Sequence, residues 1–133
     1  MHPLYPKADA VFLDALDACV EVLRHMGPGL LESVYEACLE RELVLRGHRL
    51  EKEKYVTYAY KGAAFSTTLR ADLIVDECLV IELKSLEGEL RYEHQMQVLS
   101  YLKMLNYPVG LLANFGATDR KRFKRILLKN ANR

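Results

Sequence analysis

The segment from Arg70 to Ser85 constrains the fold of this chain most, because charged side chains interrupt runs that otherwise resemble buried strands. Two β-branched, apolar runs flank an acidic turn, which is the pattern of a β-hairpin. The runs carry Asp72, Glu82 and Lys84. Strand side chains alternate between two faces, so Glu82 and Lys84 point to the same face. Because burying a charge is costly unless it is paired or bound to a metal, a function is the expected reason for these residues.

The length of the turn decides whether the two carboxylates meet. If the turn has an odd number of residues centred on Glu77, Asp72 lies directly opposite Glu82, with Cβ atoms roughly 4.5–5.5 Å apart. Two carboxylates and a backbone carbonyl suffice to hold Mg²⁺, which keeps several of its waters. Such a metal activates water and polarises a phosphoryl oxygen, and Lys84 would stabilise the charged transition state. The alternative is a structural Glu82–Lys84 pair with Asp72 near the turn.

The order of predicted elements indicates an α/β fold. Periodicity and turn residues predict helices at about 7–26, 30–46 and 90–106, and strands at about 55–60, 64–75 and 109–115, with one more strand after the acidic turn. This order predicts a single domain over residues 1–133, with a mixed four-stranded sheet flanked by helices. The last segment, 121–128, fits a strand or a short helix.

The net charge of +1 argues against a generally basic nucleic-acid binder, but the charge is uneven. The C-terminal segment 119–133 is strongly basic, with Arg120, Lys121, Arg122, Lys124, Arg125, Lys129 and Arg133. This tail could contact phosphates, and a solvated surface is an equally good interpretation.

The cysteines and the apolar runs predict a cytoplasmic protein. Cys19, Cys38 and Cys78 are odd in number and widely spaced, so we expect buried free thiols without a disulfide framework or a zinc site. No signal peptide is recognisable, and no apolar run approaches the roughly 20 residues of a membrane span. We therefore expect no membrane contact.

Several segments together resemble a known family. Asp72, followed ten residues later by Glu82-Leu83-Lys84, resembles the bipartite motif of the PD-(D/E)XK nuclease superfamily. The segment Gly29-Leu30-Leu31-Glu32-Ser33-Val34-Tyr35 is similar to the signature of the GxxExxY family within it. Segments 97–102 and 110–116 also resemble that family in the same order, so that the resemblance extends from about residue 10 to 128.

The resemblance implies a restriction-endonuclease-like αβββαβ core with an extra N-terminal helix, and it implies roles for particular residues. Asp72, Glu82 and the Leu83 carbonyl would be metal ligands. Lys84 would be the catalytic lysine. Glu32 would act on the metal or its waters, and Gln97 would line the active site. Ala71 stands where the superfamily name has proline, which removes no ligand.

The expected function is therefore hydrolysis of nucleic-acid phosphodiester bonds with Mg²⁺ or Mn²⁺. DNA is the expected substrate, and a homodimer or a protein partner is open. We expect Tyr35 to serve helix–sheet packing, Tyr101 to lie beside Gln97, and His94 to be a solvated residue at a helix start that could also reach the site. The alternative is a non-catalytic module that binds nucleic acid or protein, with Arg120–Arg125 as its binding segment.

Overall fold

The computed structural model describes residues 1–117 and 122–133, and these residues form three helices and five strands. In chain order the elements are α1 (Tyr5–Met26), α2 (Glu32–Leu45), β1 (Leu50–Tyr60), β2 (Ala63–Val75), β3 (Leu79–Lys84), α3 (Tyr92–Leu105), β4 (Val109–Asn114) and β5 (Phe123–Leu127). The predicted order is confirmed through β4. The segment that the sequence left open contains the strand β5.

The strands form one mixed sheet in the order β1-β2-β3-β4-β5. β3 and β4 are parallel, and all other neighbours are antiparallel. Parallel neighbours cannot be joined by a tight turn, so the chain crosses over through α3 between them. The predicted α/β core is present, and β5 adds a fifth strand to the predicted four beside β4.

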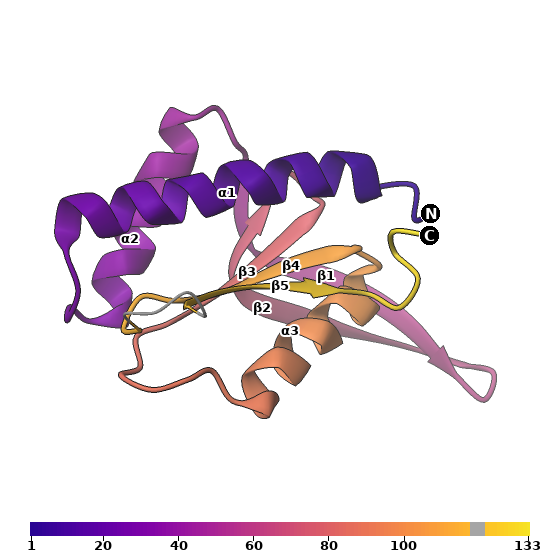
Figure 1. Cartoon of the computed structure of the whole chain (residues 1–133). Helices are drawn as coiled ribbons and strands as arrows, with labels where there is room; N and C mark the ends of the chain where they lie inside the picture. The colour runs from indigo at the N-terminus through magenta and orange to yellow at the C-terminus, as the bar shows by residue number, and fades with distance from the viewer. Residues whose placement is uncertain (118–121) are drawn as a thin grey trace.

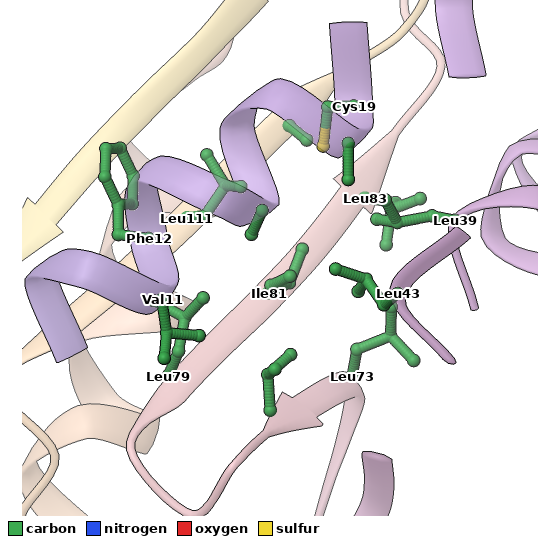
Figure 2. Close-up of a cluster of buried hydrophobic side chains, with 14 of the residues drawn as sticks. Val11, Phe12, Cys19, Leu39, Leu43, Leu73, Leu79, Ile81, Leu83 and Leu111 are labelled. Carbon is green, nitrogen blue, oxygen red and sulfur yellow. The ribbon is translucent and has the colours of Figure 1, made fainter. Parts of the chain in front are cut away.

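Helices cover both faces of the sheet, with α1 and α2 on one face and α3 on the other (Figure 1). Figure 2 shows Leu79, Ile81 and Leu83 of β3 among the side chains of the α1–α2 face. On the opposite face Val80 packs in a second cluster with Val98 of α3. β3 is therefore covered on both sides, as expected of a strand with a parallel neighbour.

α3 approaches the sheet closely at Gly110 of β4. A Cβ atom on Gly110 would lie 2.5 Å from Cγ1 of Val98, which is closer than two carbon atoms can pack. The missing side chain thus lets α3 lie against β4. It also brings Gln97, the neighbour of Val98, towards the end of β3.

The two hairpin turns set the register of the first three strands. Lys61 and Gly62 join β1 to β2 with φ values of 47° and 82°, the left-handed conformations that a two-residue type I′ turn requires. The turn between β2 and β3 consists of residues 76–78 and is centred on Glu77. This turn has the odd length that places Asp72 opposite Glu82.

His48 ties the second hairpin turn to α1. Its Nδ1 lies 2.5 Å from Oδ2 of Asp76 in the turn, and its Nε2 lies 2.6 Å from Oδ2 of Asp14 in α1. Burial lowers the pKa of His48, but the hydrogen bonds to the two carboxylates outweigh it and raise the pKa above its usual value. The charged network holds the β2–β3 hairpin in place.

β1 begins five residues earlier than the sequence predicts, at Leu50 rather than Tyr55. The alternating charges of residues 51–54 resemble a solvated loop. They are compatible with a strand because β1 is an edge of the sheet. Lys52 reaches Glu40 of α2 at 3.0 Å, and Lys54 reaches Glu51 at 3.1 Å.

The three cysteines are free thiols, of which Cys19 and Cys78 are buried and Cys38 is half-buried. Burial raises the pKa of Cys19 to about 12 and that of Cys78 to about 11. Both thiols are therefore protonated and unreactive at neutral pH. Among the residues described, none of the helices combines the length and apolar character needed to cross a bilayer.

Candidate functional site

Asp72 of β2 and Glu82 of β3 face each other where the backbone pairing of these strands ends. The last pair is Leu73 with Ile81, and one further step in the same register places Asp72 opposite Glu82. The Asp72 N–H donates to Glu82 Oε1 at 3.1 Å. The Leu83 N–H donates to Asp72 Oδ2 at 2.8 Å. Each carboxylate is thus fixed by the backbone of the opposite strand.

Glu82 is the buried member of this pair, with 5% of its surface exposed. Burial, and after it the negative charge of Asp72, raises the pKa of Glu82 to about 8, against the opposing charge of Lys84. Two neighbouring carboxyl groups do not both ionise readily, so the uncomplexed pair retains a proton. A bound cation would take the place of this proton.

Lys84 completes a cleft of about 390 Å³ with these two carboxylates. It lies two residues beyond Glu82 on the same strand and therefore on the same face. Glu32 at the start of α2 and Gln97 of α3 line the same cleft. The structure thus brings together the five side chains that the sequence singled out.

Glu32 is the first residue of α2, where unpaired backbone N–H groups favour a negative charge. Burial raises the pKa of Glu32. The positive charge of Lys84 opposes this effect, whereas Asp72 and Glu36 add to it. Glu32 therefore interacts electrostatically with both sides of the cleft, although α2 and the β2–β3 hairpin are separate elements.

Tyr35 fixes the loop that leads into α2. Its fully buried ring stacks on Phe115, with 4.6 Å between the centroids and 8° between the planes. Its hydroxyl donates to the Gly27 carbonyl at 2.6 Å and accepts from the Leu30 N–H at 3.1 Å. The expected packing role of Tyr35 is confirmed. The same contacts position Glu32, which begins the helix two residues after Leu30.

Gln97 and Tyr101 lie one helical turn apart on α3, and the Gln97 amide donates to the Tyr101 hydroxyl at 3.3 Å. Burial raises the pKa of Tyr101, and the charge of Glu82 adds to this effect. Both side chains line the cleft. Tyr101 is thus a neighbour of the carboxylates as well as of Gln97.

Three further residues of the cleft were not predicted: Ser33, Glu36 and Arg70. Arg70 lies two residues before Asp72, so the period of the strand could have identified it. Its side chain is exposed and reaches Glu53 at 3.1 Å. Glu36 lies four residues after Glu32, which is one turn along the same helix face.

His94 hydrogen-bonds to the backbone at the start of α3 and does not line the cleft. Its Nδ1 accepts a hydrogen bond from the Arg91 N–H at 3.0 Å. His94 lines a separate pocket with residues 86–89, Arg91 and Glu93, and the cleft lining does not include it. The expected position at the helix start is confirmed, but His94 is half-buried rather than fully solvated.

The oxygen atoms at the cleft fit a hard divalent cation. Within the described ranges, no group of three His, Cys, Asp or Glu side chains is placed to hold a metal. Asp72 and Glu82 therefore need a backbone ligand beside them. The Leu83 N–H points to Asp72, and because a strand residue turns its N–H and C=O to one side, its carbonyl points there too. Mg²⁺ and Mn²⁺ fit two carboxylates, a carbonyl and waters.

The described part of the basic tail does not line the cleft. Arg125 of β5 is tied to Tyr5 and Asp9 of α1 and lies 5.3 Å from the centroid of the Phe12 ring. The cleft lining includes no residue from 122–133. Arg120 and Lys121, which belong to the predicted binding segment, lie outside the described residues.

Comparison with known proteins places these features in a wider group. A family model described as the PD-(D/E)XK nuclease superfamily matches residues 10–126. The fold is similar to a crystal structure described as that of SSO0001, with a TM-score of 0.58 and 21% sequence identity. The match covers 95% of this chain and 62% of that chain, so this chain spans less than two thirds of that protein's length. No curated protein sequence matched the chain.

Proposed function

Because the chain belongs to the PD-(D/E)XK nuclease superfamily, we propose that it is a metal-dependent phosphodiesterase that hydrolyses nucleic acid, with DNA as the expected substrate. The observation that carries this proposal is the convergence of Asp72, Glu82 and Lys84 on one cleft. Two adjacent carboxylates suit a divalent cation, and an ammonium group beside them suits a phosphate. The combination is what phosphodiester hydrolysis requires.

Within the superfamily, we propose membership of the GxxExxY family. The three signature positions of that family are Gly29, Glu32 and Tyr35. Glu32 lines the cleft, and Tyr35 holds the loop before α2 through the Gly27 carbonyl. The signature thus combines a cleft residue with the residue that positions it, which supports the finer assignment.

The cation would be held by Asp72, Glu82 and the Leu83 carbonyl. When bound, it polarises a phosphoryl oxygen and acidifies a bound water. The ammonium group of Lys84 donates hydrogen bonds to the non-bridging phosphate oxygens, on which negative charge increases in the transition state. The carboxylate of Glu32 accepts a hydrogen bond from the attacking water and takes its proton as the water oxygen bonds to phosphorus. The bond from phosphorus to the leaving sugar oxygen breaks, and that oxygen takes a proton from solvent water.

Gln97 and Tyr101 orient the substrate in this scheme. The amide group of Gln97 has two N–H donors, and its bond to the Tyr101 hydroxyl uses one of them. The second can bind a phosphate oxygen. Because Tyr101 fixes the amide before substrate arrives, this hydrogen bond costs little conformational entropy.

A panel of short labelled substrates tests the proposed activity: single-stranded DNA, double-stranded DNA and RNA, each with Mg²⁺, with Mn²⁺ and with a chelator. We expect cleavage of at least one DNA substrate with metal and none with the chelator. Asp72→Asn, purified in parallel, excludes a contaminating nuclease. If neither metal supports cleavage of any substrate, the proposal fails, and a non-catalytic binding module becomes the better account.

A further inference from the structure

We propose that the outer edge of β1 pairs with the same edge of a second copy of this chain, which joins two sheets across a two-fold axis. β1 ends the sheet, and β2 is its one strand neighbour in the part of the chain that is described. Figure 1 shows the β1–β2 hairpin extending beyond the helices that cover the rest of the sheet. The exposed N–H and C=O groups of an edge strand are a template for another strand. This inference does not depend on the proposed activity.

The outer half of the hairpin has aromatic side chains where edge strands normally have charges. Between Tyr55 and Leu69, Lys61 is the one charged residue. The exposed aromatic residues are Tyr55 (71%), Tyr58 (43%), Tyr60 (64%) and Phe65 (45%). Edge strands usually avoid pairing by carrying charges, as β5 does with Lys124 and Arg125. β1 lacks this protection along its outer half.

The backbone of β1 limits how a second copy can pair with it. Tyr60 and Ala63 close the two-residue turn, so they form a hydrogen-bonded pair, and every second residue back along β1 also turns its backbone groups towards β2. The residues between them, such as Thr57 and Ala59, turn theirs outward. An antiparallel partner must therefore place outward-facing residues opposite one another.

Among the antiparallel registers that the backbone allows between two β1 strands, the charged side chains favour one. Antiparallel pairing centred on Thr57 brings Glu53 beside Lys61 of the partner subunit, which is the first turn residue after β1. Glu53 also pairs with Arg70 of its own copy at 3.1 Å, so the lysine would join an existing ion pair, and symmetry repeats this arrangement. A shift of two residues towards the turn places Tyr55 opposite that lysine and removes both ion pairs. The opposite shift would extend the pairing to Glu51, beyond the irregularity in the β1–β2 register. Opposite charges across strands are stabilising, which favours the centred register.

Apolar contacts support the same register. Pairing centred on Thr57 places Val56 opposite Tyr58 of the partner subunit. In each copy Tyr58 already stacks on Phe65, with 5.5 Å between the ring centroids. The pairing would therefore place a β-branched side chain beside the aromatic stack of the other copy, and pairs of aromatic with β-branched residues are favourable neighbours in sheets. A second copy of this chain thus complements the edge in backbone, charge and shape.

Sedimentation over a concentration series tests this proposal with the full-length chain. The wild type is expected to form dimers. Lys61→Asp is expected to weaken the dimer by roughly tenfold or more, since it makes two ion pairs repulsive. Asp-Gly is itself a preferred type I′ turn, so the hairpin is retained. Adding Glu53→Lys to this variant restores opposite charges and is expected to restore the dimer.

Thr57→Pro removes an outward-facing N–H without affecting the bonds to β2, and is expected to give a monomer with an unchanged circular dichroism spectrum. A wild type that is monomeric throughout the series overturns the proposal. A dimer that neither Lys61→Asp nor Thr57→Pro weakens also overturns it, because the contact would then lie elsewhere. The proposal is also overturned if the wild type is monomeric and its binding to oligonucleotides depends on Tyr55, since the edge of β1 would then bind nucleic acid rather than a second copy.

Discussion

Replacing Lys84 with alanine is expected to reduce nucleic-acid cleavage by roughly 10²–10³-fold or more while the protein stays folded. The ammonium group supports charge that increases on the phosphate in the transition state, so the rate should fall more than substrate affinity. Lys84 is half-buried at the end of β3, and its removal opens no cavity in the two cores that hold the sheet. Cleavage rates under single-turnover conditions measure the effect.

Lys103→Ala is the matched control, because Lys103 is an exposed lysine in the last turn of α3 and does not line the cleft. We expect this variant to cleave at the rate of the wild type. Circular dichroism and urea unfolding should show both variants folded. A Lys84→Ala variant that is folded and cleaves like the Lys103→Ala variant would exclude the catalytic role of Lys84.

Replacing Glu82 with glutamine is expected to abolish metal-dependent cleavage and at the same time to stabilise the metal-free protein. The glutamine oxygen can still accept from the Asp72 N–H, as Glu82 does at 3.1 Å. The side-chain amide of the glutamine can donate a hydrogen bond to the Asp72 carboxylate, whereas the wild type has a second carboxyl group at this position. Residues that serve function at the expense of stability are common in active sites.

The stability gain should depend on pH. The folded-state pKa of Glu82 is raised from 4.5 to about 8, first by burial, so the folded state binds a proton more tightly than the unfolded state. Wild-type stability therefore falls as pH rises from about 4.5 through about 8. Glutamine does not titrate. The free energy of unfolding of Glu82→Gln should therefore exceed that of the wild type only slightly at low pH. At pH values above the folded-state pKa of Glu82, the difference should reach roughly 1–3 kcal/mol.

Urea unfolding in the presence of a chelator, at several pH values across this window, measures the gain. Glu93→Gln is the control, because it makes the same substitution at an exposed side chain at the start of α3 that does not line the cleft. A Glu82→Gln variant that is less stable than the wild type at high pH would contradict the account. So would a gain that is the same at every pH.

The arrangement of the β2–β3 hairpin could be predicted because it depends on local rules. The alternation of side chains and the three-residue turn centred on Glu77 together determine that Asp72 lies opposite Glu82. The approach of Glu32 and Gln97 to the two carboxylates depends on how α2 and α3 pack on the sheet, and this packing involves residues that are far apart in the sequence. Their place in the cleft was predicted through the resemblance to known nucleases, not through periodicity.

Other features depend on tertiary context that the sequence pattern does not contain. The charged start of β1 forms a strand because α2 supplies partners for Lys52. β5 forms because β4 has a free edge beside it, which a short basic segment does not reveal. The exposure of Tyr58 and its neighbours is also not visible in the sequence, since aromatic residues in a strand are normally interpreted as core.

Asp72 and Glu82 are proposed to hold one divalent cation between them. Calorimetric titration of the chain with Mn²⁺ measures this binding, with Asp72→Asn as the test variant and Asp17→Asn, an exposed α1 residue, as the control. We expect one binding event per chain for the wild type and the control, and affinity weakened by roughly tenfold or more for Asp72→Asn. Equal binding heats and affinities for all three proteins, or no binding by the wild type, would exclude a cation held by these two carboxylates.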